Sequence, residues 1–145
     1  MLRLSKKAEY GLMAMQYIAA RPGTVVSAKE IAEEYDVSFD LLSKVLQLLM
    51  RRDIIQSYKG VNGGYVMLLH PSSVSVADVI RAIEGKSALV QCSDDDENCS
   101  CRHYQGCTIR TPMQKIQDRI DRVLASMTIA EMMDSTQADR PVQAV

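Results

Sequence analysis

The sequence has no cysteine outside one short, polar stretch. All four cysteines, Cys92, Cys99, Cys101 and Cys107, lie there with the spacing C-x6-C-x-C-x5-C. Free cysteines that fill a core are usually buried, and they would be scattered along helices and strands. Their absence elsewhere indicates that these thiols bind something or react with one another.

Long apolar runs are also missing. No stretch approaches the roughly 20 apolar residues needed to span a bilayer. Residues 1–7 are followed by an amphipathic pattern and not by the apolar region of a signal peptide. We therefore expect a cytoplasmic protein with no membrane partner. In that compartment clustered cysteines bind metal or sense redox state more often than they form structural disulfides.

The chain lacks a basic arm, because 17 Lys and Arg are balanced by 18 Asp and Glu, for a formal net charge of −1. If the protein binds nucleic acid, its positive charge must be concentrated on one face, and dimerisation would double it. Signatures of an enzyme are missing too. Cys99 and Cys101 lie outside any βαβ pattern, with no convincing base or substrate pocket. We expect no enzymatic activity, with a thiol oxidoreductase as the rival hypothesis.

What is present in the first half is the pattern of three helices and a β-hairpin. Ser5, Ser27 and Ser38 are placed to cap helices that run to about Ala20, Tyr35 and Arg52. The second and third helices, joined by the tight turn 36–38, form a helix-turn-helix. Strands are expected over 54–58 and 65–69, with positive φ supplied by Asn62-Gly63 in the turn between them. These parts predict a winged helix-turn-helix, the alternative being a small α+β domain with no nucleic-acid role.

The third helix is the expected recognition helix, which would enter the major groove of DNA. The candidate contacts on it are Ser38, Asp40, Ser43, Lys44, Gln47 and Arg51. Ser43 and Gln47 are placed to read base edges, and Asp40 to accept from a cytosine amine. Lys44 and Arg51 would neutralise phosphates. For each of them, a solvated polar face is the alternative.

Two further contacts with DNA are expected outside this helix. Lys59 at the tip of the wing would reach the minor groove or a phosphate, and Gly60 would let the backbone come close. Lys6, at the N-terminus of the first helix, would meet a phosphate.

The second half contains three more helices and the cysteine loop. A capping box at Ser75 starts a short helix to about Gly85, Thr111 and Pro112 are expected to start a long helix after the loop, and Thr128 caps a last short one. The long helix carries a heptad seam, Met113, Ile116, Ile120, Val123 and Met127. Such a seam suits a partner helix, so we expect a dimerisation helix, with packing on its own domain as the alternative.

The predicted organisation follows from these elements. Residues 1–85 form the DNA-binding domain and 86–110 a cysteine-rich loop. Residues 111–133 form the dimerisation helix and a short C-terminal helix, and 134–145 a disordered tail. The fold class is mainly α with a small β-hairpin wing.

Three kinds of chemistry fit the cysteine loop. A structural zinc site usually has paired C-x2–4-C spacings, which these spacings suit poorly. A thiol–disulfide switch needs two close thiols, and Cys99 and Cys101 would serve. An iron–sulfur cluster is larger and tolerates irregular spacing, with one non-cysteine ligand allowed.

The order of these parts resembles the Rrf-two family of bacterial iron–sulfur regulators, which includes the IscR-, NsrR- and RirA-type proteins. The matching segments are Leu4–Gly11, Asn62–Tyr65 and Val79–Gly85, with the cysteine loop and the long helix after it. The resemblance covers about residues 1–133 and looks closest to the branch that regulates the SUF cluster-assembly operon.

That resemblance implies a homodimer with a cluster held near the base of each dimerisation helix. The family's three-cysteine pattern falls on Cys92, Cys107 and either Cys99 or Cys101, of which we favour Cys101. The cluster is expected to be 2Fe–2S, with 4Fe–4S as the alternative.

The resemblance also bears on the remaining ligand. Glu9, donated by the partner subunit, matches a carboxylate that completes the ligand set in some members; the alternative is a first-turn acid that favours the helix dipole. Where other members place a histidine ligand, this chain has Arg110.

The implied function is a transcriptional repressor of iron–sulfur assembly genes, in which cluster state controls affinity for a double-stranded DNA operator. A nitric oxide- or redox-sensing regulator, or a clusterless or zinc-bound thiol switch of the same fold, is the alternative.

Overall fold

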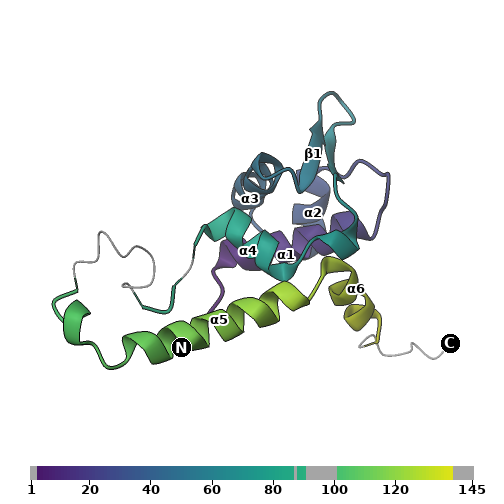
Figure 1. The fold of residues 1–145 in the computed structure, drawn as a ribbon. Helices are drawn as coiled ribbons and strands as arrows, with labels where there is room; N and C mark the ends of the chain where they lie inside the picture. The colour runs from purple at the N-terminus through teal and green to yellow at the C-terminus, as the bar shows by residue number, and fades with distance from the viewer. Residues whose placement is uncertain (1–2, 87, 91–100, 139–145) are drawn as a thin grey trace.

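The computed structural model describes residues 3–86, 88–90 and 101–138. It is mostly helical with one antiparallel hairpin, as predicted (Figure 1). The α-helices are α1 (Lys6–Ala19), α2 (Ala28–Tyr35), α3 (Phe39–Arg51), α4 (Val76–Glu84), α5 (Arg110–Ser126) and α6 (Ile129–Ala138). The strands are β1 (Ile55–Tyr58) and β2 (Gly64–Met67), and short 3-10 turns lie at η1 (Pro71–Ser73) and η3 (Tyr104–Gly106).

Helices α1 to α4 begin where the sequence predicted, because serine hydroxyls accept hydrogen bonds from the first free backbone N–H groups. Ser5, Ser27 and Ser38 each accept from the N–H three residues on, at 3.2, 3.1 and 3.4 Å. Ser75 and Asp78 form a full capping box at the start of α4. At α2 the Glu30 carboxylate accepts instead from the Tyr17 hydroxyl, at 2.9 Å.

Helix α1 lies at the centre of the DNA-binding domain and packs on α3 and α4. Its inner face carries small residues, with Ala8 and Ala14 fully buried. Gly11 allows the closest approach, because a Cβ there would lie 2.1 Å from Cδ1 of Ile83 on α4. A single core therefore joins α1, α3 and α4 and holds α3 on the surface of the domain.

The wing is the β1–β2 hairpin, paired from Ile55↔Met67 to Tyr58↔Gly64. The prediction that Asn62-Gly63 supplies the positive φ of the turn is wrong. The tip is a longer loop in which Gly60 has the positive φ, at 119°, and Gly63 N–H donates to its carbonyl. Gly63 is instead required by crowding, since a Cβ there would lie 2.5 Å from the Tyr58 carbonyl oxygen.

Helix α5 begins earlier than predicted, so the assignment of Thr111 as its N-cap is wrong. Ile109 already has helical backbone angles, and its carbonyl accepts from Met113 N–H at 2.9 Å. The helix is therefore under way before the Thr111 hydroxyl could cap it. Helix α5 extends past the domain formed by α1–α4, as Figure 1 shows.

The chain after α5 returns to the DNA-binding domain. Thr128 and Glu131 form the predicted capping box, and Ile129 is fully buried, its N–H donating to the Val74 carbonyl at 2.9 Å. Helix α6 packs on α1 and continues to Ala138, beyond Asp134, where we expected the tail to begin. Among the described residues, no helix has the length and apolar character needed to cross a membrane.

Candidate functional site

The turn between α2 and α3 sets the direction of α3. Asp36 ends α2 in the left-handed conformation, with φ and ψ both 51°, and Val37 N–H donates to the Ala32 carbonyl at 3.0 Å. Asparagine and aspartate tolerate this conformation better than other residues with a side chain. Two residues later Ser38 caps α3, so its hydroxyl has a structural role whether or not DNA is bound.

Helix α3 has one buried and one open face. Leu42, Val45, Leu46 and Leu49 are buried against the core. Asp40, Lys44, Gln47 and Arg51 are exposed and recur every three or four residues, so they share the outer face, and Ser43 is half-buried beside them. Within the described part of the chain, none of these five side chains makes a hydrogen bond or ion pair. Five of the six predicted DNA contacts on α3 are therefore brought together with free side chains, and the sixth, Ser38, caps the helix.

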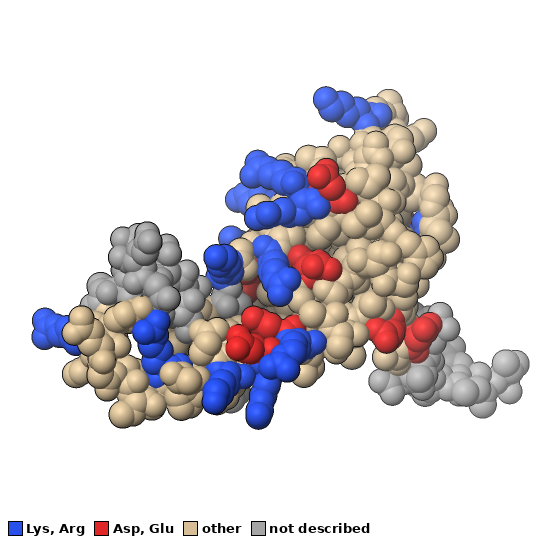
Figure 2. Space-filling model, in the orientation of Figure 1, with Lys and Arg blue, Asp and Glu red and all other residues tan. Residues whose placement is uncertain are grey.

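The tip of the wing adds a second exposed element. Lys59 and Gly60 are exposed there, and the positive φ of Gly60 requires a residue without a side chain. Figure 2 shows Lys and Arg side chains at the tip of the wing and over α3 on one face of the molecule. Positive charge is thus gathered on the face that carries α3 and the tip of the wing, although the chain as a whole is nearly neutral.

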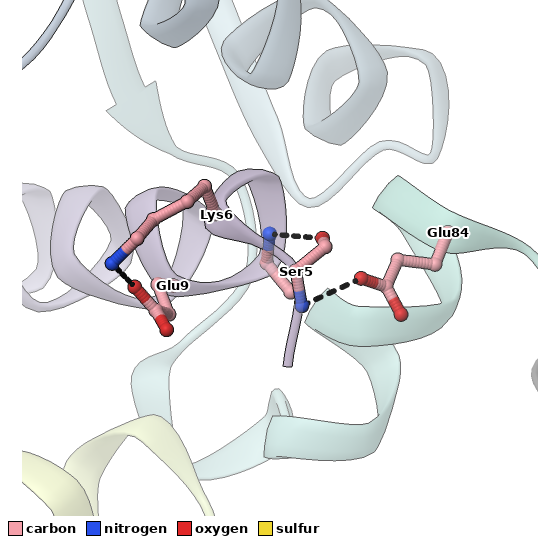
Figure 3. A network of polar contacts seen from close by, with 5 residues as sticks. Ser5, Lys6, Glu9 and Glu84 are labelled. Atoms are coloured by element: carbon pink, nitrogen blue, oxygen red, sulfur yellow. Dashed lines mark hydrogen bonds and ion pairs between the residues drawn. The ribbon is translucent and has the colours of Figure 1, made fainter. Parts of the chain in front are cut away.

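Lys6 is placed differently from the other predicted phosphate contacts. Its ammonium group is 2.5 Å from a carboxylate oxygen of Glu9, one turn along α1 (Figure 3). Ser5 N–H donates to the Glu84 carboxylate at 3.3 Å, which ties the start of α1 to the end of α4. Glu9 is half-buried and paired with Lys6, so it would have to leave this partner to bind a metal.

Two of the four cysteines lie in the described residues. Cys101 is exposed and Cys107 half-buried, and both are free thiols. Cys92 and Cys99 lie outside the described residues. In the described part of the chain, no three His, Cys, Asp or Glu side chains are grouped so as to hold a metal ion.

The segment between Cys101 and α5 is fixed at its aromatic residue. The Arg110 guanidinium donates to the Tyr104 hydroxyl at 2.7 Å and stacks over its ring at 4.1 Å from the centroid. Tyr104 N–H in turn donates to the Cys101 carbonyl at 3.2 Å. Cys107 therefore lies between Tyr104 and Arg110, whose contact holds this segment to the first turn of α5. Sequence reasoning missed the pair, since a contact between residues six apart at a helix start has no periodic signal.

The other side of the cysteine loop is also attached to α5. Gln117 is buried, accepts from Leu89 N–H at 3.0 Å and donates to Asp121 at 2.9 Å. This residue too was missed, because a glutamine on a charged helix looks solvent-facing until its partner is known. Both ends of the loop are thus held along one side of α5.

The fold and the open face of α3 define a winged helix-turn-helix transcriptional regulator that binds DNA. The sequence profile of the Rrf2 family, described as an iron-dependent transcriptional regulator, matches residues 4–135. The chain belongs to this family.

Individual proteins agree with that assignment. The chain is 38% identical to the HTH-type transcriptional regulator BadM of Rhodopseudomonas palustris, over 70% of this chain and 67% of that protein. The solved structure of T. potens IscR matches with a TM-score of 0.77 and 27% identity, over 99% of this chain and 94% of that one. CymR (YrzC), the global cysteine regulator of B. subtilis, matches with a TM-score of 0.74 and 27% identity, over 93% and 98%. The family and BadM are described as transcriptional regulators, a class distinct from enzymes.

Proposed function

We propose that this protein is a homodimeric, iron–sulfur-cluster-binding repressor of iron–sulfur cluster assembly genes. The observation that carries the proposal is the gathering of every cysteine of an iron-dependent regulator into one polar loop held to α5. The choice of the SUF assembly operon follows from the sequence resemblance alone. A regulator of this kind acts on DNA in the cytoplasm.

The donor chemistry fits such a cluster. Cys101 and Cys107 offer thiols that are neither fully buried nor tied up in a disulfide, and thiolates are the usual ligands of iron–sulfur clusters. Our proposed ligands are Cys92, Cys101 and Cys107, with Cys99 as the alternative middle ligand, and Glu9 of the partner subunit. When bound, the cluster supplies chemistry that responds to iron, oxidants or nitric oxide. The 2Fe–2S form is preferred over 4Fe–4S on the family resemblance.

The proposed dimer uses the apolar seam of α5. Ile116 and Val123 on α5 are 43% and 68% exposed, and Met127 just past its end is 47% exposed; exposed apolar side chains that lie together in this way are typical of an interface. Burial of these side chains against a second α5 would remove apolar surface from water. Dimers are typical of the family, and two recognition helices about one DNA turn apart would suit a symmetric operator.

Residues at the start of α1 connect the two halves of the proposed mechanism. Cys107 is held next to α5 by the Arg110–Tyr104 pair, and Glu9 lies on α1, which packs on α3. If Glu9 of the partner subunit is a ligand, it ties the cysteine loop of one subunit to the DNA-binding domain of the other. Its release would loosen the relative placement of the two α3 helices. The two states need to differ in DNA-binding free energy by about 1–3 kcal/mol to regulate a gene.

The test is an anaerobic purification followed by a visible absorption spectrum and by iron, sulfide and zinc assays on the same sample. A brown protein with iron and acid-labile sulfide supports the proposal, and the shape of the bands separates 2Fe–2S from 4Fe–4S. A colourless protein with zinc, or with no metal, contradicts the cluster and leaves the DNA-binding function intact.

A thiol switch is the second candidate, favoured by two observations. Cys101 is exposed, and a solved structure of Staphylococcus aureus CymR in its oxidised form matches this chain with a TM-score of 0.69 and 26% identity. In that case the colourless protein would lose or gain operator affinity when treated with an oxidant, and a reductant would reverse the change.

A further inference from the structure

A pocket of about 580 Å³ lies between the C-terminal end of α3, the start of the wing and α4. This volume is within the usual range for small-molecule sites. Ile54 and Val74 in its lining are buried, and Leu69 is partly exposed beside them. The pocket therefore has an apolar part large enough for the hydrocarbon body of a small molecule.

Three cationic side chains also line this pocket. Arg52 follows α3, Arg81 lies in the last turn of α4, and Lys86 comes just after α4. All three are exposed, and across residues 3–86, 88–90 and 101–138 none has an ion-pair partner or a side-chain hydrogen bond. Figure 2 shows Lys and Arg side chains over α3 and over α4 on the same face.

The negative charges near the pocket cancel only part of the positive charge of these three side chains. Asp78 also lines the pocket, but one of its carboxylate oxygens accepts from Ser75 N–H at 2.9 Å and from the Ser75 hydroxyl at 2.7 Å. The C-terminal ends of α3 and α4 each contribute roughly half a negative charge. About one positive charge remains uncompensated, which suits one carboxylate better than a multiply charged anion.

We propose that this pocket binds a small monocarboxylate with an apolar body. The carboxylate would pair with Arg52 and Arg81, whose guanidinium groups match its geometry, and Lys86 would add a third donor. The hydrocarbon body would cover Ile54 and Val74. The site is separate from the cysteine loop and does not depend on a cluster.

Hexanoate and its uncharged counterpart hexanamide are suitable probes, titrated into the full chain and followed by ¹H–¹⁵N chemical shifts at constant ionic strength. Hexanoate should shift resonances of residues 52–54, 73–74 and 81–86 and bind about tenfold more tightly than hexanamide, because it alone gains charge-assisted hydrogen bonds. The double variant Arg52→Gln, Arg81→Gln should weaken hexanoate binding by about tenfold or more. Ala82→Leu, which adds volume to the pocket lining without changing charge, should weaken hexanoate binding. Lys29→Gln, which removes one exposed charge from α2, should leave it unchanged.

Three results would overturn the proposal: no shifts with hexanoate, equal binding of the two probes, or equal loss in the Lys29→Gln control. If hexanoate causes no shifts and the double variant loses affinity for duplex DNA, the cations bind the DNA backbone and not a carboxylate.

Discussion

Gly64 shows how tightly the wing is attached to the rest of the domain. Val26 and Tyr65 exchange backbone hydrogen bonds of 2.9 and 2.7 Å, which adds a short third segment beside the hairpin. A Cβ on Gly64 would lie 2.3 Å from the Val26 carbonyl oxygen, and neither backbone can move without breaking this pairing. The position of the wing thus depends on the absence of one methyl group.

Gly64→Ala should lower the free energy of unfolding by about 1–3 kcal/mol, the usual cost of forcing extra volume into a packed site. Urea denaturation of the full chain measures the change. Gly106→Ala is the matched control, because a Cβ there meets nothing within 4 Å. It should change stability by less than about 0.5 kcal/mol. Similar losses in both variants would contradict the steric explanation.

Lys59 carries the wing's predicted contribution to DNA binding. Lys59→Gln should weaken binding to duplex DNA and reduce the slope of log K against log salt by about 0.9 for each phosphate that the side chain neutralises. Binding titrations at several salt concentrations measure this slope. Lys29→Gln, on α2, should leave the slope unchanged, and an unaltered slope for Lys59→Gln would show that this residue does not bind a phosphate.

At the scale of elements, α5 has two faces in different surroundings. One side holds the cysteine loop through Gln117 and packs on α4, while the seam residues Ile116 and Val123 remain exposed in a single chain. A helix that is apolar on a side without a neighbour is typical of an interface.

Val123→Glu should therefore weaken the proposed dimer without unfolding the chain, because a carboxylate would be desolvated in the seam but not in the monomer. Sedimentation or light scattering measures the molar mass against concentration. Lys115→Glu changes an exposed position on α5 outside the seam and should leave the mass unchanged. A dimer that persists in Val123→Glu would place the interface elsewhere.

Helix α6 is attached to the domain through a pH-dependent cap. Hydrogen bonds from Thr128 N–H and from its hydroxyl lower the pKa of Glu131 from its usual 4.5. A lowered pKa in the folded state adds stability that is present above the unfolded value and is lost as pH falls through the folded value. Glu131→Gln should unfold at a lower urea concentration than the original protein near neutral pH. The difference should begin to shrink as pH falls below 4.5 and should vanish once pH is below the lowered pKa of the folded state; a difference that does not depend on pH would contradict the cap.

At the scale of the whole molecule, the proposed signal has to cross between subunits. The cysteine loop is held to α5, α5 carries the seam, and α1 carries both Glu9 and the packing surface for α3. The ion pair between Lys6 and Glu9 connects ligand binding to a predicted DNA contact. The Glu9 carboxylate pairs with Lys6 in the single chain, and its use as a ligand would free the ammonium group for a phosphate.

Cys107→Ala should abolish the visible absorption of the anaerobic protein and change operator affinity by about fivefold or more, the range of ordinary allosteric coupling. A spectrum and a DNA titration on the same preparation measure both. Unchanged colour and unchanged affinity would contradict the cluster mechanism, while helicity by circular dichroism checks that the variant folds.

The sequence by itself determined the elements and their order. Serine caps, helical spacing of apolar residues and the glycine-rich hairpin act over a few residues, so Ser5, Ser38 and Ser75 predicted helix starts correctly. The family followed from the same local motifs. The polar face of α3 could also be predicted from the sequence, because a helix that buries four aliphatic side chains on one side must leave its other side chains exposed to solvent.

Only the tertiary structure decided which groups meet across the chain. Local propensity favoured Asn62-Gly63 for the turn, but Gly60 has the positive φ. Gly63 is needed because the Tyr58 backbone lies close, and Gly64 because the Val26 backbone lies close. The hydrogen bond between Gln117 and Leu89, and the convergence of Arg52, Arg81 and Lys86 on one pocket, depend on how the loop and α3, α4 and α5 pack. Such contacts join residues on different helices or different turns, and no periodic pattern in the sequence encodes their distance.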